Sequence, residues 1–163
     1  LRERNSRNHP WSRCAARSIL MHVYADTSAV FALCHPADPF FTVVNKRDRR
    51  HRPQLFYPPW LRFEVRHSLT VHRGYEEGEA AWRALLASER SFVGVRENWL
   101  AVIQLAGDLS AQFGGQVLCG GMDVLHVASA LKLEAAEFWT CDANQAEFAS
   151  VYGLKVVDFS TAV

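Results

Sequence analysis

The sequence predicts one α/β domain in which a mostly parallel sheet of four or five strands is covered by helices on both faces. Short apolar segments that suit buried strands alternate with longer segments of helical character along most of the chain. Strands that are covered on both faces are apolar throughout, and these segments have that composition. The length of 163 residues and the apolar fraction of 49% fit one domain with a sizeable core.

The first elements of the predicted domain are a strand and two helices. Residues 21–25 are expected to form a buried strand, and residues 27–34 a helix. Pro36 and Pro39 then indicate a loop, because proline interrupts regular structure. A second helix is expected over 39–46.

The middle of the chain repeats this alternation. A short strand is expected at 54–57, and the two prolines at 58–59 suit the first turn of a helix that starts at Trp60. That helix should run to about His72, because Gly74 is a typical residue just beyond a helix end. Another helix is expected over 76–88.

The last third of the chain supplies the remaining strands and helices. Pairs of glycines at 114–115 and 120–121 separate two helical segments. The predicted elements are a strand at 91–95, a helix at 97–112, a helix at 123–133, a strand at 138–141, a helix at 143–152 and a strand at 155–159.

Residues 1–20 differ from the rest of the chain. They hold five arginines and one acid, and they show no periodicity. The first methionine, Met21, stands where the first strand begins, so we expect it to be the natural start and residues 1–20 to be translated upstream sequence. The domain proper is then 21–163. The alternative is a basic arm that contacts nucleic acid.

Composition excludes several classes of protein. Without residues 1–20 the chain holds 13 basic and 16 acidic residues, so the domain is not a basic wrapper for nucleic acid. The four cysteines form no C-x-x-C pair, which favours reduced thiols in a cytoplasmic protein. No apolar run approaches the roughly 20 residues of a membrane-spanning helix, so no membrane association is expected.

Four acidic residues are expected to meet at one edge of the sheet. Asp26 and Asp142 directly follow predicted strands, and ligand sites of open α/β sheets lie beyond the carboxyl ends of their strands. Asp123 begins an apolar helix, and Glu64 lies one turn into the helix after the two prolines. The alternative for each aspartate is a helix cap, and for Glu64 an exposed helix position.

Carboxylates that share a pocket repel one another, and a divalent cation removes that penalty. Ligand sets made of oxygen select hard ions such as Mg²⁺ or Mn²⁺. These ions activate water and stabilise the charge that develops on a phosphate during attack. The pattern therefore favours hydrolysis of phosphodiester bonds.

Three sequence blocks resemble the motifs of PIN domains. They are Y-A-D-T-S-A-V at 24–30, M-D-V-L-H-V-A-S-A-L at 122–131, and F-W-T-C-D-A-N-Q-A-E-F-A followed by Y-G-L-K-V-V. The resemblance covers 21–159 and is strongest to the toxin subunits of bacterial VapBC toxin–antitoxin pairs. It implies a three-layer α/β/α fold, Mg²⁺- or Mn²⁺-dependent ribonuclease activity, a homodimer and an inhibitory antitoxin.

The resemblance also implies roles for individual residues. The first, third and fourth family acids fall on Asp26, Asp123 and Asp142, and Glu64 is the best candidate for the second. Ser28 and Thr140 match positions that support the site through hydroxyl hydrogen bonds. Many members carry another acid at the position of Asn144, so a second metal is less supported than the first. Asn144 is therefore counted, with Ser28 and Thr140, among the residues expected to support the site and not among its acids.

Basic residues near the site are candidates for RNA contact. Lys46, Arg49 and Arg50 belong to a basic run over 46–52, for which a solvated surface is the alternative. Arg62 and Arg66 lie four residues apart, on the helical face near Glu64. They can bind phosphate, or they can pair with acids and support the helix.

The leading hypothesis is a toxin-type endoribonuclease. One alternative is a PIN nuclease in RNA processing without an antitoxin, and another is a degenerate PIN domain that binds RNA or protein without cleavage. Asp26 is followed by Thr27 and Ser28, so the D-x-D pair of haloacid-dehalogenase-type phosphatases is absent from the sequence. A glycine-rich P-loop is absent as well.

Overall fold

Five parallel strands form the centre of the structure, a computed structural model that describes residues 21–113 and 115–162. The strands are β1 (His22–Ala25), β2 (Gln54–Phe56), β3 (Ser91–Val93), β4 (Glu137–Thr140) and β5 (Val156–Asp158). Their order across the sheet is β3-β2-β1-β4-β5, and each neighbouring pair is parallel. The predicted extension at 1–20 lies outside the described residues.

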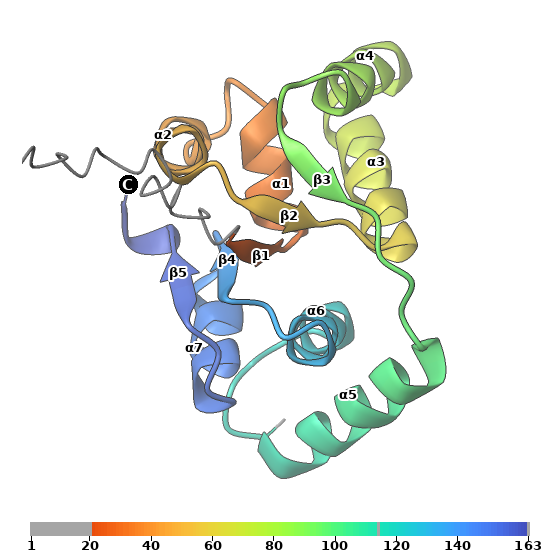
Figure 1. Ribbon diagram of the computed structural model, residues 1–163, viewed down its shortest axis with the longest axis vertical. Coiled ribbons are helices and arrows are strands. Elements are labelled where there is room, and N and C mark those ends of the chain that lie inside the picture. The colour runs from red at the N-terminus through yellow and green to blue at the C-terminus, as the bar shows by residue number, and fades with distance from the viewer. Residues whose placement is uncertain (1–20, 114, 163) are drawn as a thin grey trace, which may run out of the picture.

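Helices cover both faces of this sheet (Figure 1). They are α1 (Thr27–Cys34), α2 (Phe41–His51), α3 (Pro59–Arg73), α4 (Tyr75–Leu86), α5 (Trp99–Phe113), α6 (Gly121–Lys132) and α7 (Ala143–Val151), followed by a short 3₁₀ turn, η1 (Ser160–Ala162). The first four lie on one face, and α5, α6 and α7 lie on the other (Figure 1). This arrangement is the predicted three-layer α/β/α fold.

The core sits on both sides of the central strands. Tyr24 of β1 stacks on Phe138 of β4, with ring centroids 5.8 Å apart, and both side chains are fully buried. Leu61 and Leu69 of α3 are buried on one face, and Phe148 of α7 on the other. Because both faces are covered, the central strands β1 and β4 are almost entirely inaccessible, as their apolar sequences predict.

The packing of α4 on α3 depends on a glycine. A Cβ atom at Gly78 would lie 2.8 Å from the carbonyl oxygen of Leu69, which is closer than any side chain tolerates. Gly74, at φ 77°, ends α3 and begins α4. This tight hairpin of helices fixes the position of α3, which carries Glu64.

Of the predicted elements, only the helix over 27–34 has the same bounds in the structure; most of the others differ by one or two residues at an end, and α2 differs most. The helix expected over 39–46 is α2, Phe41–His51, because Arg90 binds Asp48 at 3.0 Å and Arg47 binds Glu137 at 2.9 Å, which anchors the charged turn. The strand expected at 138–141 is β4, Glu137–Thr140.

No helix in the described residues is long and apolar enough to cross a bilayer.

Candidate functional site

The four predicted acids line one cleft at the carboxyl ends of β1 and β4. Its volume is about 630 Å³, and Asp26, Glu64, Asp123 and Asp142 all contribute to its lining. The rim comes from the loop between α1 and α2 and from the outer part of α3. Other lining residues include Thr27, Ser28, His35, Asp38, Ser68, His72, His126, Cys141 and Gln145.

Asp26 is the most deeply placed of these acids, with 2% of its surface exposed. It caps α1 by accepting the Ala29 amide at 2.8 Å, and it accepts the hydroxyls of Ser28 and Thr140, each at 2.7 Å. Burial raises the pKa of Asp26 above its ordinary value, although the charge of His126 and these hydrogen bonds oppose the rise. All of its hydrogen-bond donors are neutral.

Two hydroxyl groups tie β4 to α1 and end the strand. Ser28 accepts the Cys141 amide at 2.9 Å, and Thr140 accepts the Asp142 amide at 3.0 Å. These amides are therefore bonded to side chains and not to a neighbouring strand. As a result β4 ends at Thr140. Asp142 is therefore the second residue after the strand, and not the first as predicted.

Glu64 is half-buried on α3 and is held by two polar side chains. Its Oε2 atom accepts a short hydrogen bond from the Thr27 hydroxyl and lies 2.9 Å from Nε2 of His126. Burial alone would raise the pKa of Glu64, but the hydrogen bonds from His126 and Thr27 outweigh it and leave the pKa below its usual value. Glu64 is therefore not the exposed helix residue of the alternative interpretation.

His126 connects Glu64 to the core. Its side chain is 2% exposed, and Nδ1 lies 3.1 Å from the Tyr24 hydroxyl. Its ring also packs on Trp60, with the ring centroids 4.5 Å apart. His126 is therefore a hydrogen-bonded core residue that also contacts an acid of the cleft.

Asp123 and Asp142 occupy helix starts. Asp123 lies in the first turn of α6 and accepts the Gly120 amide at 2.8 Å, whereas Asp142 caps α7 by accepting the amides of Asn144 and Gln145. Burial raises the pKa of Asp123, and the negative charges of Asp142 and Glu64 raise it further, against the Gly120 hydrogen bond. The cap interpretation is therefore correct for Asp26 and Asp142, which nevertheless face the same cleft.

In the part of the chain that the structure describes, neither lysine nor arginine neutralises these acids. Among the described residues, no lysine or arginine nitrogen lies within 4.0 Å of a carboxylate oxygen of the four, and His126 is their only ion-pair partner. Burial is the main cause of the raised pKa of Asp123, and the charges of Asp142 and Glu64 add to it, because cleft carboxylates without a basic partner repel one another. This arrangement suits a site for an external cation.

The donor set fits a hard divalent ion. No three acidic, histidine or cysteine side chains within the described part of the chain form a ready-made ligand cluster. Mg²⁺ retains several water molecules and is usually bound by only one or two carboxylates directly, so a closed cluster is not required. Carboxylate oxygens on the wall of an open cleft can therefore bind Mg²⁺ while leaving room for its water molecules.

The predicted RNA contacts lie outside the cleft. Arg66 forms an ion pair with Glu79 at 2.5 Å, which is the alternative role considered for it, and the guanidinium of Arg62 lies 5.8 Å from the centre of the Tyr57 ring. Lys46, Arg49 and Arg50 are on α2, and Asn144 is exposed in the first turn of α7. None of these six residues lines the cleft.

Two further polar residues belong to the site without having been predicted. Thr27 binds Glu64, and Gln145 is 1% exposed and lies 3.0 Å from the Thr140 hydroxyl through its Oε1 atom. Thr27 stands next to Asp26 in the D-T-S sequence, and Gln145 lies one helical turn after Asp142. A polar residue beside a motif acid, or three residues after it, is the signal that could have identified them.

Comparison with solved structures identifies the fold. VapC20 of Mycobacterium tuberculosis, a toxin that cleaves the sarcin-ricin loop, is 18% identical with a TM-score of 0.62, over 83% of this chain and 98% of that one. VapBC-1 of nontypeable Haemophilus influenzae is 16% identical with a TM-score of 0.61, over 86% and 99%. FitAcB of Neisseria gonorrhoeae is 15% identical with a TM-score of 0.60, over 85% and 98%.

No protein-family model matches the chain, and no curated protein matches it by sequence. The likeness to these solved structures is a likeness of fold. The chain therefore has the PIN-domain, VapC-like fold that the three sequence motifs predict.

Proposed function

We propose that this protein is a Mg²⁺- or Mn²⁺-dependent endoribonuclease and the toxin of a toxin–antitoxin pair. One observation carries the proposal: the four predicted acids line a single cleft, beside Asp38, and no lysine or arginine of the described chain neutralises them. The VapC-like fold supports it, because the similar VapC20 is a toxin that cleaves the sarcin-ricin loop.

The four acids divide into two roles in the proposed site. Asp26, Asp123 and Asp142 would hold the ion, directly or through water. A bound divalent ion would supply an activated water and would offset the charge that builds on the phosphate. Glu64 would orient the attacking water, and Thr27 and His126 fix the position of its carboxylate.

The protein chain supplies preorganisation. Asp26 accepts hydrogen bonds from three donors, so its carboxylate keeps one orientation before any ion arrives. Holding catalytic groups in the reactive geometry in advance lowers the reorganisation that the reaction requires. Ser28 and Thr140 therefore act as positioning residues in this proposal.

Asp26→Asn tests the proposal. Asparagine is also a good helix cap, so the fold should persist, whereas Mn²⁺-dependent cleavage of a defined RNA panel should fall by at least about 100-fold, since the loss of a metal ligand removes several kcal/mol of stabilisation. Asp108→Asn is the matched control, because Asp108 is exposed on α5. Cleavage by Asp26→Asn at the wild-type rate, or cleavage unaffected by EDTA, would contradict the proposal.

The proposed partners follow from the same comparison. The similar structures include VapBC-1 and FitAcB, so we expect an antitoxin that inhibits this chain. A homodimer in its absence is expected only from the resemblance of the sequence motifs to VapBC toxins. Light scattering of the purified chain, with and without the product of the adjacent reading frame, tests both expectations.

One observation favours a second candidate, a binding module without catalysis. Asp26 and Asp142 already serve as helix caps, and the described residues hold no closed metal-ligand cluster. RNA binding that persists without any cleavage in Mn²⁺ would support this candidate over the nuclease.

A further inference from the structure

A second pocket lies at the opposite edge of the sheet from the acidic cleft. It has a volume of about 410 Å³ and is formed where β2 and β3 begin, whereas the cleft lies where β1 and β4 end. Its lining includes Asp48, Arg49, Arg52, Glu89, Arg90 and Ser91. Arginines from two separate segments, the end of α2 and the residue before β3, therefore meet there.

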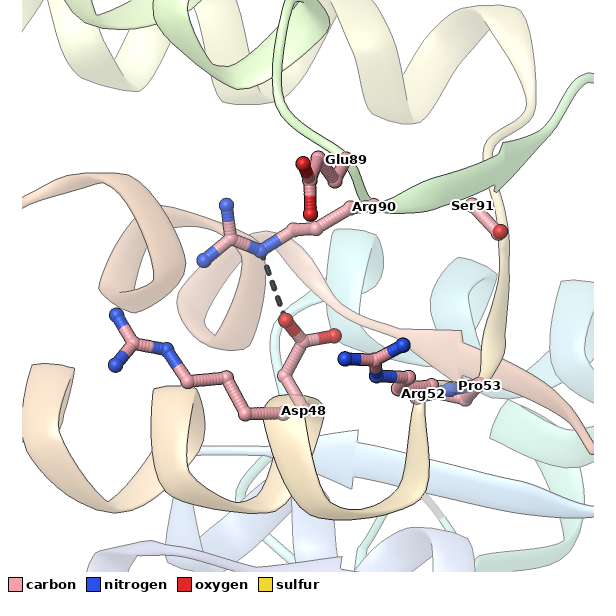
Figure 2. A pocket seen from close by; sticks show the side chains of 7 residues that line it. Asp48, Arg52, Pro53, Glu89, Arg90 and Ser91 are labelled. Atoms are coloured by element: carbon pink, nitrogen blue, oxygen red, sulfur yellow. Dashed lines mark hydrogen bonds and ion pairs between the residues drawn. The ribbon is translucent and has the colours of Figure 1, made fainter.

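Arg90 is fixed in place by the protein. Its Nε atom donates to Asp48 at 3.0 Å and its terminal nitrogen to Asn45 at 2.5 Å. Figure 2 shows Arg90 reaching over the Asp48 carboxylate, with Arg52 on the other side of that carboxylate. Asp48 forms its ion pair with Arg90, and the charge of Arg49 also acts on the Asp48 carboxylate from a greater distance.

Arg49 and Arg52 are exposed, and neither forms an ion pair within the described residues. The exposed Glu89 is the other acid in the lining. The pocket therefore presents two unpaired guanidinium groups against one carboxylate. A guanidinium donates in a planar fork that matches the oxygens of a phosphate.

The backbone of Arg52 supports a role for its side chain. Arg52 ends α2 in the left-handed conformation, at φ 44° and ψ 55°. Glycine or asparagine usually occupies this position, because a larger side chain is strained there. An arginine thus stands where the backbone conformation favours glycine, and its side chain lines the pocket.

Compensation of the helix dipole explains only part of this cluster. Basic side chains at the end of a helix are favourable by themselves, and Arg49, Arg50 and His51 all stand in the last turn of α2. That account leaves Arg90 unexplained, since it comes from another segment. It also does not require an arginine in the left-handed conformation at position 52.

We propose that this pocket binds a phosphate group of the RNA backbone, away from the bond that is cut. The proposal rests on the proposed function, because it takes RNA as the substrate. The pocket and the cleft lie at opposite ends of strands of three or four residues, or about 10–13 Å in length.

The test is RNA binding by the full chain in EDTA, measured by fluorescence anisotropy on single-stranded RNA. Arg49→Gln and Arg52→Gly should each weaken binding roughly fivefold, as expected for one partly exposed charged hydrogen bond. Together they should reduce the slope of log affinity against log salt by about 1.4. Glu89→Gln should strengthen binding, because it removes the exposed negative charge.

Arg50→Gln is the matched control, because it removes the same charge from the same helix. Arg50 is exposed but does not line the pocket. Its affinity should stay within about twofold of wild type. The Arg52→Gly variant should have an unchanged or higher melting temperature, because glycine relaxes the left-handed residue.

Equal losses in Arg49→Gln and Arg50→Gln would overturn the proposal, since they would indicate general attraction to a basic helix. Unchanged RNA affinity in the pocket variants would also overturn it, including the case in which inorganic phosphate binds there alone. Failure of the nuclease proposal is distinguishable, because it appears as absent cleavage in Mn²⁺ while the pocket variants still differ in RNA affinity.

Discussion

Buried carboxylates lie near both ends of β4, but their hydrogen-bond donors differ in charge. At its beginning, Glu137 is 2% exposed and is bound by Arg47 at 2.9 Å, by Lys155 at 2.8 Å and by the Trp139 indole at 2.9 Å. At its other end, Thr140 donates to Asp26, the residue that follows β1. Asp26 is equally buried but accepts hydrogen bonds only from neutral donors. The two carboxylates therefore differ in their partners and not in their depth.

Their pKa values move in opposite directions for that reason. Burial favours the neutral acid at both positions, but at Glu137 the hydrogen bonds from Lys155, Arg47 and Trp139 outweigh it and lower the pKa to about 2. At Asp26 burial prevails and the pKa is raised. Glu137 is neutralised by cations of the chain itself, whereas the cleft acids have no lysine or arginine partner within the described residues.

The largest effect on stability is expected from Glu137→Gln. The change leaves Arg47 and Lys155 without their carboxylate, and breaking a buried ion pair costs about 3–5 kcal/mol. Because Lys155 is largely exposed, we expect about 2–4 kcal/mol, seen as a fall in melting temperature of roughly 5–15 °C. Glu147→Gln, at an exposed position of α7, is the control and should change little; equal stability of the two variants would remove the comparison.

Acid should weaken the fold through the same group. The folded-state pKa of Glu137 is about 2, below its ordinary value of 4.5, so its contribution is complete above pH 4.5 and is lost as the pH falls towards 2. The loss amounts to at most about 3 kcal/mol. Denaturant unfolding between pH 6 and 2 measures it, and the dependence should be shallower in Glu137→Gln; identical curves would show that Glu137 does not carry this effect.

Thr27→Val should affect cleavage more than stability. The variant removes one of the two hydrogen bonds that orient Glu64, and a bond to a charged group contributes roughly 1.5–3 kcal/mol, so cleavage should slow by about tenfold or more. Thr27→Ser should restore the rate, because it restores the hydroxyl. Thr70→Val, which removes an exposed hydroxyl from α3, should leave cleavage unchanged; an equal loss there would argue against the orienting role.

The smallest effect on stability is expected from Asp123→Asn without metal. Asp142 and Glu64 both disfavour the charge of Asp123, so removing that charge relieves repulsion, while asparagine can still accept the Gly120 amide. The free energy of unfolding in EDTA should change by less than about 0.5 kcal/mol, or rise. A loss as large as that of Glu137→Gln would mean that Asp123 has a structural role as well.

The cleft could be predicted from sequence because strand ends and motif acids coincide. Asp26 follows β1, Asp142 lies just past β4, and both reach the same edge since the strands are parallel. The parallel arrangement follows from the alternation of strands and helices. The placement of these acids therefore required no knowledge of side-chain contacts.

The structural role of Glu137 was not predictable in the same way. Its cationic partners Arg47 and Lys155 lie in α2 and beside β5, far from it in the chain, and nothing in the local sequence marks the pairing. The full extent of α2 has the same origin, since Arg90 holds Asp48 across 42 residues. Contacts between distant side chains decide these features, and periodicity does not contain them.

We propose that the cleft acids bind a divalent cation and that Glu137 does not. Titration of the metal-free protein with Mn²⁺, followed by calorimetry, tests it directly. We predict binding by the wild type, Asp108→Asn and folded Glu137→Gln, and its loss in Asp26→Asn and Asp123→Asn. Absence of binding in the wild type, or full binding by both cleft variants, would contradict the account.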